Sequence, residues 1–153
     1  MLTLQPQTNH LFTVERATGL IPAFEAHLKR IRAHRNAAQR VATQLEAAGI
    51  SVFAGNMLPK VDGPPDVVKK LEAIRTHLAD LRTEIEQIAS YGCALKDVDR
   101  GLIDLPSRRD GRTVFLCWQS GEHAITHWHE IDSGFSGRRP IEAPSDFVGA
   151  PLN

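Results

Sequence analysis

One apolar pattern limits the possible folds of this chain more than any other. Seven apolar residues follow one another in alternating steps of four and three: Val67, Leu71, Ile74, Leu78, Leu81, Ile85 and Ile88. This heptad spacing places their side chains along one face of an α-helix, and Gly92 is a typical helix stop. An isolated helix with such a seam is unstable in water, so the seam needs a partner.

An earlier segment offers that partner. Thr13 is a suitable N-cap for a helix that begins at the sequence VERA, although Gly19 and Pro22 make its start irregular. Beyond Pro22 the positions Phe24, Leu28, Ile31, Ala38, Ala42 and Leu45 again form one apolar face, which Arg35 interrupts. The intervening GISVFAGNMLPKVDGPP is rich in glycine and proline and is typical of a connection.

Two long helices joined by one connection predict an antiparallel, coiled-coil-like hairpin over residues 13–92. Its seams either cover each other within one chain or form a docking surface for a partner. Because the Val67–Ile88 seam is nearly continuous whereas the first helix carries Arg35, we expect a homodimer.

The chain changes character after Gly92. Short runs such as GLIDLP, TVFLCW and AITHWHE are separated by the turn-forming pairs Asp110-Gly111 and Ser120-Gly121. They predict a small antiparallel β-meander over residues 93–142, followed by a tail over residues 143–153. The expected fold class is α+β, with a helical hairpin and a meander in a single domain that covers residues 1–153.

Charge and composition exclude several partners. The 153 residues contain 18 Lys and Arg and 18 Asp and Glu, so no net field attracts nucleic acid or an anionic membrane. A group of arginines (Arg30, Arg32, Arg35 and Arg40) lacks interleaved aromatic residues and is interpreted as a solvated helix face. We expect a cytoplasmic protein with free thiols at Cys93 and Cys117, since neither a signal peptide nor a membrane-spanning segment is recognisable.

Two histidines form a candidate site in the segment THWHE. Side chains alternate across a strand, so His127 and His129 would point to one face and Trp128 and Glu130 to the other. A His-x-His pair is half of a divalent metal site, which Asp97 or Asp104 would complete. In the alternative interpretation, His129 makes a structural hydrogen bond in the core and His127 lies exposed at a sheet edge.

Other chemical groups leave similar alternatives open. Cys117 is either a nucleophile activated by His129 or a small buried apolar residue. Arg138, in the segment GFSGRRP, either binds a carboxylate or phosphate of a ligand or pairs inside the protein with Asp97, Asp104 or Glu130. The sequence contains no phosphate-binding loop, dinucleotide fingerprint or Ser-His-Asp signature, so it does not predict an enzyme.

The runs GCALKDVDRGLIDLP, GRTVFLCWQSGE and ITHWHEIDSGFSGRRPI resemble an uncharacterised prokaryotic family, domain of unknown function 2203. The resemblance covers most of the chain. The family pattern falls on Lys96, Asp97, Gly101, Asp104, Pro106, Cys117, Trp118, Gly121, Glu122, Trp128, His129, Glu130, Gly134, Phe135, Gly137, Arg138 and Pro140. His123 and His127 depart from the pattern, which weakens the His-x-His pair as a metal site.

The resemblance implies a site without naming a reaction. It favours Asp97, Asp104, Glu130 and Arg138 as ligand-binding residues and His129 with Asp104 as metal ligands, while Cys117, Trp118, Glu122, His127 and Trp128 are further candidates. We therefore expect a small cytoplasmic protein that binds a small ligand or a divalent metal on the C-terminal sheet. The alternative is a structural or protein-interaction module in which the polar cluster is internal scaffolding.

Overall fold

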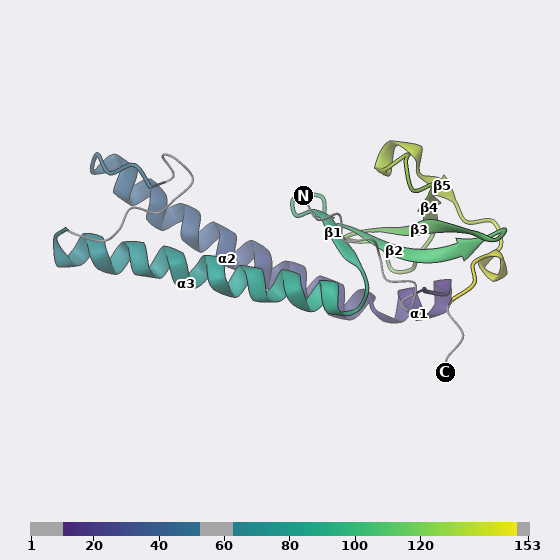
Figure 1. Cartoon of the computed structure of the whole chain (residues 1–153). Coiled ribbons are helices and arrows are strands. Elements are labelled where there is room, and N and C mark those ends of the chain that lie inside the picture. The colour runs from purple at the N-terminus through teal and green to yellow at the C-terminus, as the bar shows by residue number, and fades with distance from the viewer. Residues whose placement is uncertain (1–10, 53–62, 150–153) are drawn as a thin grey trace. The chain divides into compact units, whose positions relative to one another are not determined.

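The structure is a computed structural model that describes residues 11–52 and 63–149 (Figure 1). Most of the predicted glycine- and proline-rich connection, residues 53–62, lies outside the described residues, as does the end of the predicted tail. The chain forms two compact units, one of residues 29–85 and one of residues 1–28 with 86–153. Each unit is described by itself.

The first helices begin as their sequence predicts. Helix α1 spans Val14–Gly19, and the hydroxyl of its N-cap Thr13 accepts a hydrogen bond from the Arg16 amide at 3.1 Å. Helix α2 spans Ile21–Ala47, with Pro22 in its first turn, where a missing amide hydrogen does no harm. The irregular start expected around Gly19 and Pro22 is therefore the boundary between two helices.

The unit of residues 29–85 is a helical hairpin, as predicted. Helix α3 spans Pro65–Ser90 and packs along α2 (Figure 1). The core of this unit contains only apolar side chains, namely Ala38, Ala42, Leu45, Val52, Leu71 and Ile74. Val67 and Leu78 of the predicted seam pack against this core but remain half-buried. The two seams therefore face each other within the chain.

The other unit carries a five-stranded antiparallel sheet in sequence order, which confirms the predicted meander. Its strands are β1 (Ala94–Asp97), β2 (Leu102–Arg109), β3 (Arg112–Gln119), β4 (His127–His129) and β5 (Arg139–Pro140). Asp110 and Gly111 join β2 to β3 with φ values of 51° and 75°. Two successive positive φ angles are characteristic of the tight hairpin turn expected for an Asp-Gly pair.

One face of this sheet forms the apolar core of its unit. Ile103, Leu105, Leu116 and Trp118 are fully buried. The ring of Trp118 contacts that of Phe24 at a centroid distance of 5.6 Å. Alternation along the strands places Asp104 and Cys117 on the opposite face, because they are cross-strand partners in the β2–β3 register. Asp104 and Cys117 therefore lie on the face opposite the aromatic core, where both are also buried.

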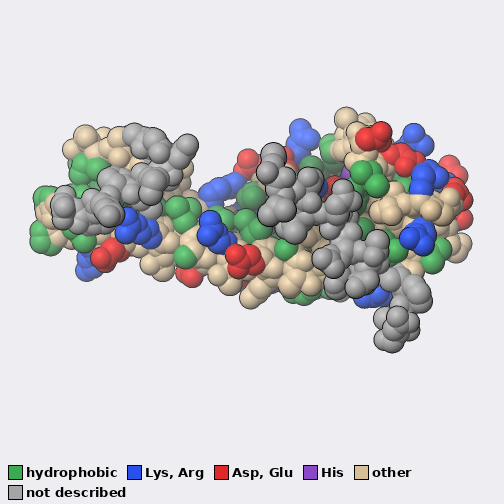
Figure 2. Space-filling view, viewed as in Figure 1, with side chains coloured by type: hydrophobic (Ala, Val, Ile, Leu, Met, Phe, Trp, Pro, Cys, Tyr) green, Lys and Arg blue, Asp and Glu red, His purple; other side chains and the backbone are tan. Residues whose placement is uncertain are grey.

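The surface agrees with the balanced charge of the sequence. On the face shown in Figure 2, basic and acidic side chains are interspersed and do not gather into one charged patch. Among the residues that the structure describes, no helix combines the length and the apolar character that crossing a membrane requires.

Candidate functional site

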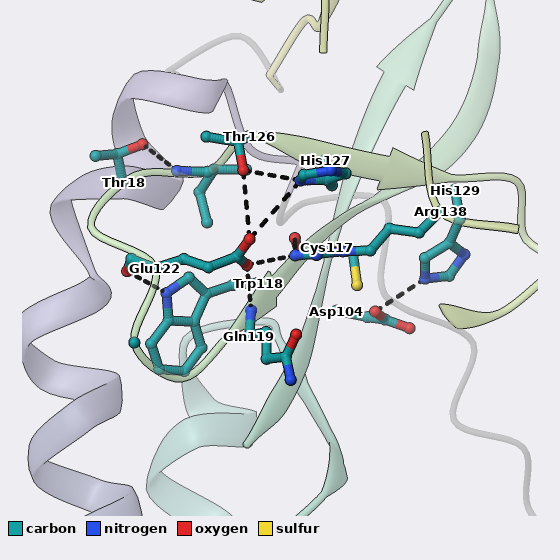
Figure 3. A network of polar contacts seen from close by, with 12 residues as sticks. Thr18, Asp104, Cys117, Trp118, Gln119, Glu122, Thr126, His127, His129 and Arg138 are labelled. Atoms are coloured by element: carbon teal, nitrogen blue, oxygen red, sulfur yellow. Dashed lines mark hydrogen bonds and ion pairs between the residues drawn. The ribbon is translucent and has the colours of Figure 1, made fainter. Parts of the chain in front are cut away.

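Three strands bring Asp104, Cys117 and His129 together (Figure 3). Asp104 of β2 lies directly opposite Cys117 of β3, and His129 of β4 pairs with Phe115, two residues before Cys117 on the same face. The three side chains are buried, and one potential ligand atom of each lies within 4.8 Å of the others. A carboxylate, a thiol and an imidazole thus converge inside the protein.

Two hydrogen bonds fix the orientation of His129. Its Nδ1 lies 2.7 Å from the main-chain carbonyl oxygen of Glu130. A carbonyl can only accept, so Nδ1 carries a proton and donates it. The other nitrogen, Nε2, lies 2.9 Å from Oδ1 of Asp104. This is the arrangement of many metal-binding histidines, in which one nitrogen is anchored to the protein and the other is directed at the site.

The same contacts determine the charge of His129 when no cation is bound. Burial by itself lowers the pKa of His129, but hydrogen bonds with Asp104, Cys117 and the Glu130 carbonyl, together with the charge of Asp104, outweigh it and raise the pKa to about 10. Without a cation, the ring is therefore an imidazolium paired with the Asp104 carboxylate. Such a buried pair is costly to desolvate and adds little stability by itself.

The position of Cys117 separates two kinds of chemistry. A thiol nucleophile activated by histidine has its base oriented by a third group on the other ring nitrogen. Here the carbonyl of Glu130 occupies Nδ1, while Figure 3 shows the sulfur of Cys117 on the side of the ring that faces Asp104. Thiol and carboxylate therefore share the Nε2 side, where the ring nitrogen is already hydrogen-bonded to Asp104. This arrangement is compatible with joint binding of a cation.

A second polar cluster surrounds Glu122. Its carboxylate forms a close ion pair with Arg138 and accepts a hydrogen bond from the Gln119 amide at 2.7 Å. Its carbonyl accepts from the Trp118 indole at 2.9 Å. Arg138 also donates to the carbonyl of Cys117 at 3.0 Å, so it contacts the main chain that carries the thiol (Figure 3). Arg138 thus pairs with an acidic residue of the protein, but this residue is Glu122, which was not among the expected partners Asp97, Asp104 and Glu130.

The two histidines of the THWHE segment have different partners. His127 lies opposite Cys117 in the β3–β4 register, but its Nδ1 lies 2.8 Å from the hydroxyl of Thr126 and 3.7 Å from a carboxylate oxygen of Glu122. His127 therefore belongs to the Glu122 cluster and His129 to the Asp104 cluster. Trp128 points away from both, with Arg109 stacked over its ring at 4.6 Å.

The structure does not bring the carboxylates of Glu130 and Asp97 to His129. The carboxylate of Glu130 pairs with Arg112, whose Nη2 lies 2.5 Å from Oε1, and this hydrogen bond lowers the pKa of Glu130. Asp97 caps the turn between β1 and β2, where its Oδ1 accepts from the Arg100 amide at 2.9 Å. Of the residues favoured by the family resemblance, Asp104 and His129 meet, and Cys117 joins them.

Comparison with known sequences supports the resemblance found in the motifs. The family model described as an uncharacterized conserved protein, DUF2203, matches residues 10–141, a range that contains all the described helices and strands of the hairpin and the sheet. Searches of curated proteins and of solved structures found no match. The match covers most of the chain, including both polar clusters, and the chain therefore belongs to the DUF2203 family.

Proposed function

We propose that this protein binds a divalent metal ion, with zinc the best match, between Asp104, Cys117 and His129. The observation that carries the proposal is the convergence of these three buried side chains from neighbouring strands. Imidazole, thiolate and carboxylate are the three ligand types of protein-bound zinc. A mixed set of this kind suits zinc better than magnesium or calcium, which prefer oxygen ligands alone.

The dimensions of the cluster support a zinc ion. Ligand atoms around tetrahedral zinc are about 3.3 to 3.8 Å apart, as follows from metal–ligand bonds of roughly 2.0 to 2.3 Å. The potential ligand atoms here lie within 4.8 Å of one another, so small side-chain rotations would bring them to the ion. Binding would release the proton of His129 Nε2 and that of the Cys117 thiol. The charge of the ion would then balance those of the thiolate and the carboxylate.

Three protein ligands leave one tetrahedral position for water or another small ligand. This count is typical of zinc sites that bind or activate a molecule, whereas purely structural sites use four protein ligands. The Glu130 carbonyl and the Arg138 contact with Cys117 support the site from behind, by fixing the histidine ring and the main chain of β3.

Internal scaffolding is the second candidate function, favoured by the 2.9 Å contact between His129 and Asp104. In that case the ion pair links β2 to β4 across β3 without a metal ion. The protein then acts as a structural or interaction module. The two candidates differ in one respect: a metal site loses stability when a chelator is added, and a scaffold does not.

Metal analysis of protein purified without a histidine tag tests the proposal. After zinc loading and gel filtration, wild type should retain one zinc per chain more than His129→Ala retains, while a variant of the exposed His123, His123→Ala, should retain as much as wild type. Wild-type melting temperature should fall on addition of a strong chelator. A wild type that retains no zinc and melts identically with and without chelator would refute metal binding and leave the scaffold.

A further inference from the structure

A pair of histidines faces each other across the helical hairpin. His34 of α2 and His77 of α3 are both half-buried, and their Nδ1 atoms lie 3.1 Å apart. The ring centroids are 5.4 Å apart with an interplanar angle of 43°. Both residues belong to the compact unit of residues 29–85, so their contact lies within one well-defined body. Each helix thus presents the same ring nitrogen to the other.

The chemistry of imidazole makes this contact adaptable. With both rings neutral, the contact is an N–H···N hydrogen bond, in which one Nδ1 carries the proton and the other offers a lone pair. If the donating ring moves its proton to Nε2, both Nδ1 lone pairs are directed into the same gap. Two facing lone pairs repel each other without a cation, but with a cation between them they form a chelate.

The separation of the two nitrogens suits one transition-metal ion. An ion about 2.1 Å from each nitrogen would see two atoms 3.1 Å apart at an angle of roughly 95°. This angle lies between those of square-planar and tetrahedral coordination, so Cu²⁺, Ni²⁺ and Zn²⁺ all accept it. Water would occupy the remaining positions, because a two-histidine site fills only half of a four-coordinate shell.

The surroundings of the pair are compatible with a cation. Asp80 follows His77 by three positions, which places its exposed carboxylate on the same side of α3. Arg30, one turn before His34 on α2, forms an ion pair with Glu84 at 2.7 Å, which offsets its positive charge. A bound ion would therefore lie near the carboxylate of Asp80 and near Arg30, whose charge is offset by Glu84.

We propose that His34 and His77 form a second metal site, for a divalent ion with a preference for imidazole, that clamps α2 to α3. The site shares no residue with the Asp104, Cys117 and His129 cluster, and it does not depend on the function proposed for that cluster. The ion would cross-link two helices whose shared buried core consists of apolar side chains. It would thereby stabilise the hairpin by an amount that grows with the logarithm of the metal concentration above the dissociation constant.

Titration of the full-length, tag-free protein with Ni²⁺ tests the clamp. Isothermal calorimetry and thermal unfolding should show that Ni²⁺ binds and raises the melting temperature of wild type by several degrees. His34→Gln and His77→Gln should each weaken binding roughly a hundredfold, because the second imidazole acts intramolecularly. His123→Ala, which removes an exposed histidine elsewhere, should behave like wild type.

A second measurement identifies the ligands directly. Cu²⁺ electron paramagnetic resonance of a Cys117→Ser, His129→Ala background, which lacks two of the three ligands of the other cluster, should report two coordinating imidazole nitrogens. Adding His77→Gln to this background should reduce that number to one. Unchanged Ni²⁺ affinity in both glutamine variants, with circular dichroism showing folded helices, would overturn the clamp. So would a Ni²⁺ response that disappears with His129→Ala alone, since that result assigns the ion to the sheet.

Discussion

The sheet and the helical hairpin treat ionisable side chains in opposite ways. Among the described residues of the hairpin unit, every buried side chain is apolar, and the ion pair between Arg30 and Glu84 leaves the arginine half exposed. In the sheet unit, Asp104 and His129 are only 6% and 2% exposed. Burying such groups costs several kcal/mol that their mutual attraction only partly offsets.

This difference supports the sheet as the place of the proposed function. The hairpin shows that the chain can build a compact core from apolar side chains alone. The sheet has the same option, since its other face is filled by apolar and aromatic residues, yet it keeps a carboxylate, a thiol and an imidazole in contact. A group retained at a cost in stability is a candidate for chemistry, and the hairpin is then the scaffold.

The largest effect on the free energy of unfolding should come from Asp104→Ala. This substitution leaves His129 buried without its partner, and breaking a buried pair in this way costs about 3 to 5 kcal/mol. The matched change in the hairpin, Glu84→Ala, should cost less than about 1 kcal/mol, because Arg30 remains solvated. Urea denaturation of metal-free protein, followed by circular dichroism, measures both.

Equal losses for the two variants would break the comparison between the units. Asp104→Asn is a useful control, since its amide oxygen still accepts from His129 while the charge is removed. If the free energy of unfolding of Asp104→Asn lies between those of wild type and Asp104→Ala, its two differences separate the contribution of the charge from that of the hydrogen bond.

A smaller loss, about 2 kcal/mol, is expected for Glu122→Ala. The substitution removes the acceptor of the Gln119 amide and the partner of Arg138, whose side chain is only 12% exposed. Glu122→Gln should recover part of the loss by keeping an acceptor. Thermal melting of the three proteins measures the series, and a melting temperature of Glu122→Ala equal to that of wild type would show that Arg138 finds another partner.

Much of the fold was predictable because it depends on local pattern. The spacing of Leu71, Ile74 and their neighbours indicates a helix whatever surrounds it, and Asp110-Gly111 defines a tight turn by backbone conformation alone. The fifth strand was not predicted by itself, because Arg139 and Pro140 form a two-residue strand with no recognisable period. Such a strand forms only because β4 lies beside it.

The site was less predictable because it depends on register. A two-residue turn at Asp110 and Gly111 places Arg109 opposite Arg112 and, five pairs further along the hairpin, Asp104 opposite Cys117. The Asp110-Gly111 turn and the register that it sets can be recognised in the sequence. They would have placed Cys117 beside Asp104 and so among the main candidates for the site. No local signal shows that Glu130 pairs with Arg112 or that Arg138 pairs with Glu122, since both partners lie on other segments.

The third test concerns the homodimer predicted for the hairpin. Loss of the dimer contact should lower the free energy of unfolding by only about 1 kcal/mol or less per chain. Leu81 and Ile85 of the α3 seam are half-buried, which leaves apolar surface for the homodimer predicted from the heptad pattern. Light scattering at roughly 50 µM should give a dimer mass for wild type, because oligomers form by mass action. Leu81→Lys should give a monomer with intact helices. A wild type that is monomeric at this concentration would refute the dimer.

The smallest effect concerns the thiol of Cys93, which is 7% exposed just before β1. Burial raises the pKa of Cys93 to about 12. In the unfolded chain the thiol ionises near pH 8.5, so the folded state holds a proton that the unfolded state releases. The stability contributed by the neutral thiol is therefore complete below pH 8.5 and is lost as the pH rises toward 12. The loss is only roughly half a kcal/mol near pH 8.5, which makes reactivity the better measurement.

Alkylation of a Cys117→Ser variant with iodoacetamide isolates Cys93, since the sequence contains no other cysteine. The thiolate is the nucleophile, so native protein should react slowly from pH 7 to pH 10, and the same protein in urea should react quickly above pH 8. Cys117→Ser also removes one ligand of the proposed zinc, so the experiment is run with chelator present in every sample. Fast alkylation of native protein with a midpoint near pH 8.5 would show that Cys93 is accessible to solvent. In that case the sheet unit would bury the Asp104 cluster but not Cys93 before β1. Only the Asp104 cluster would then distinguish the sheet from the hairpin in the burial of ionisable side chains.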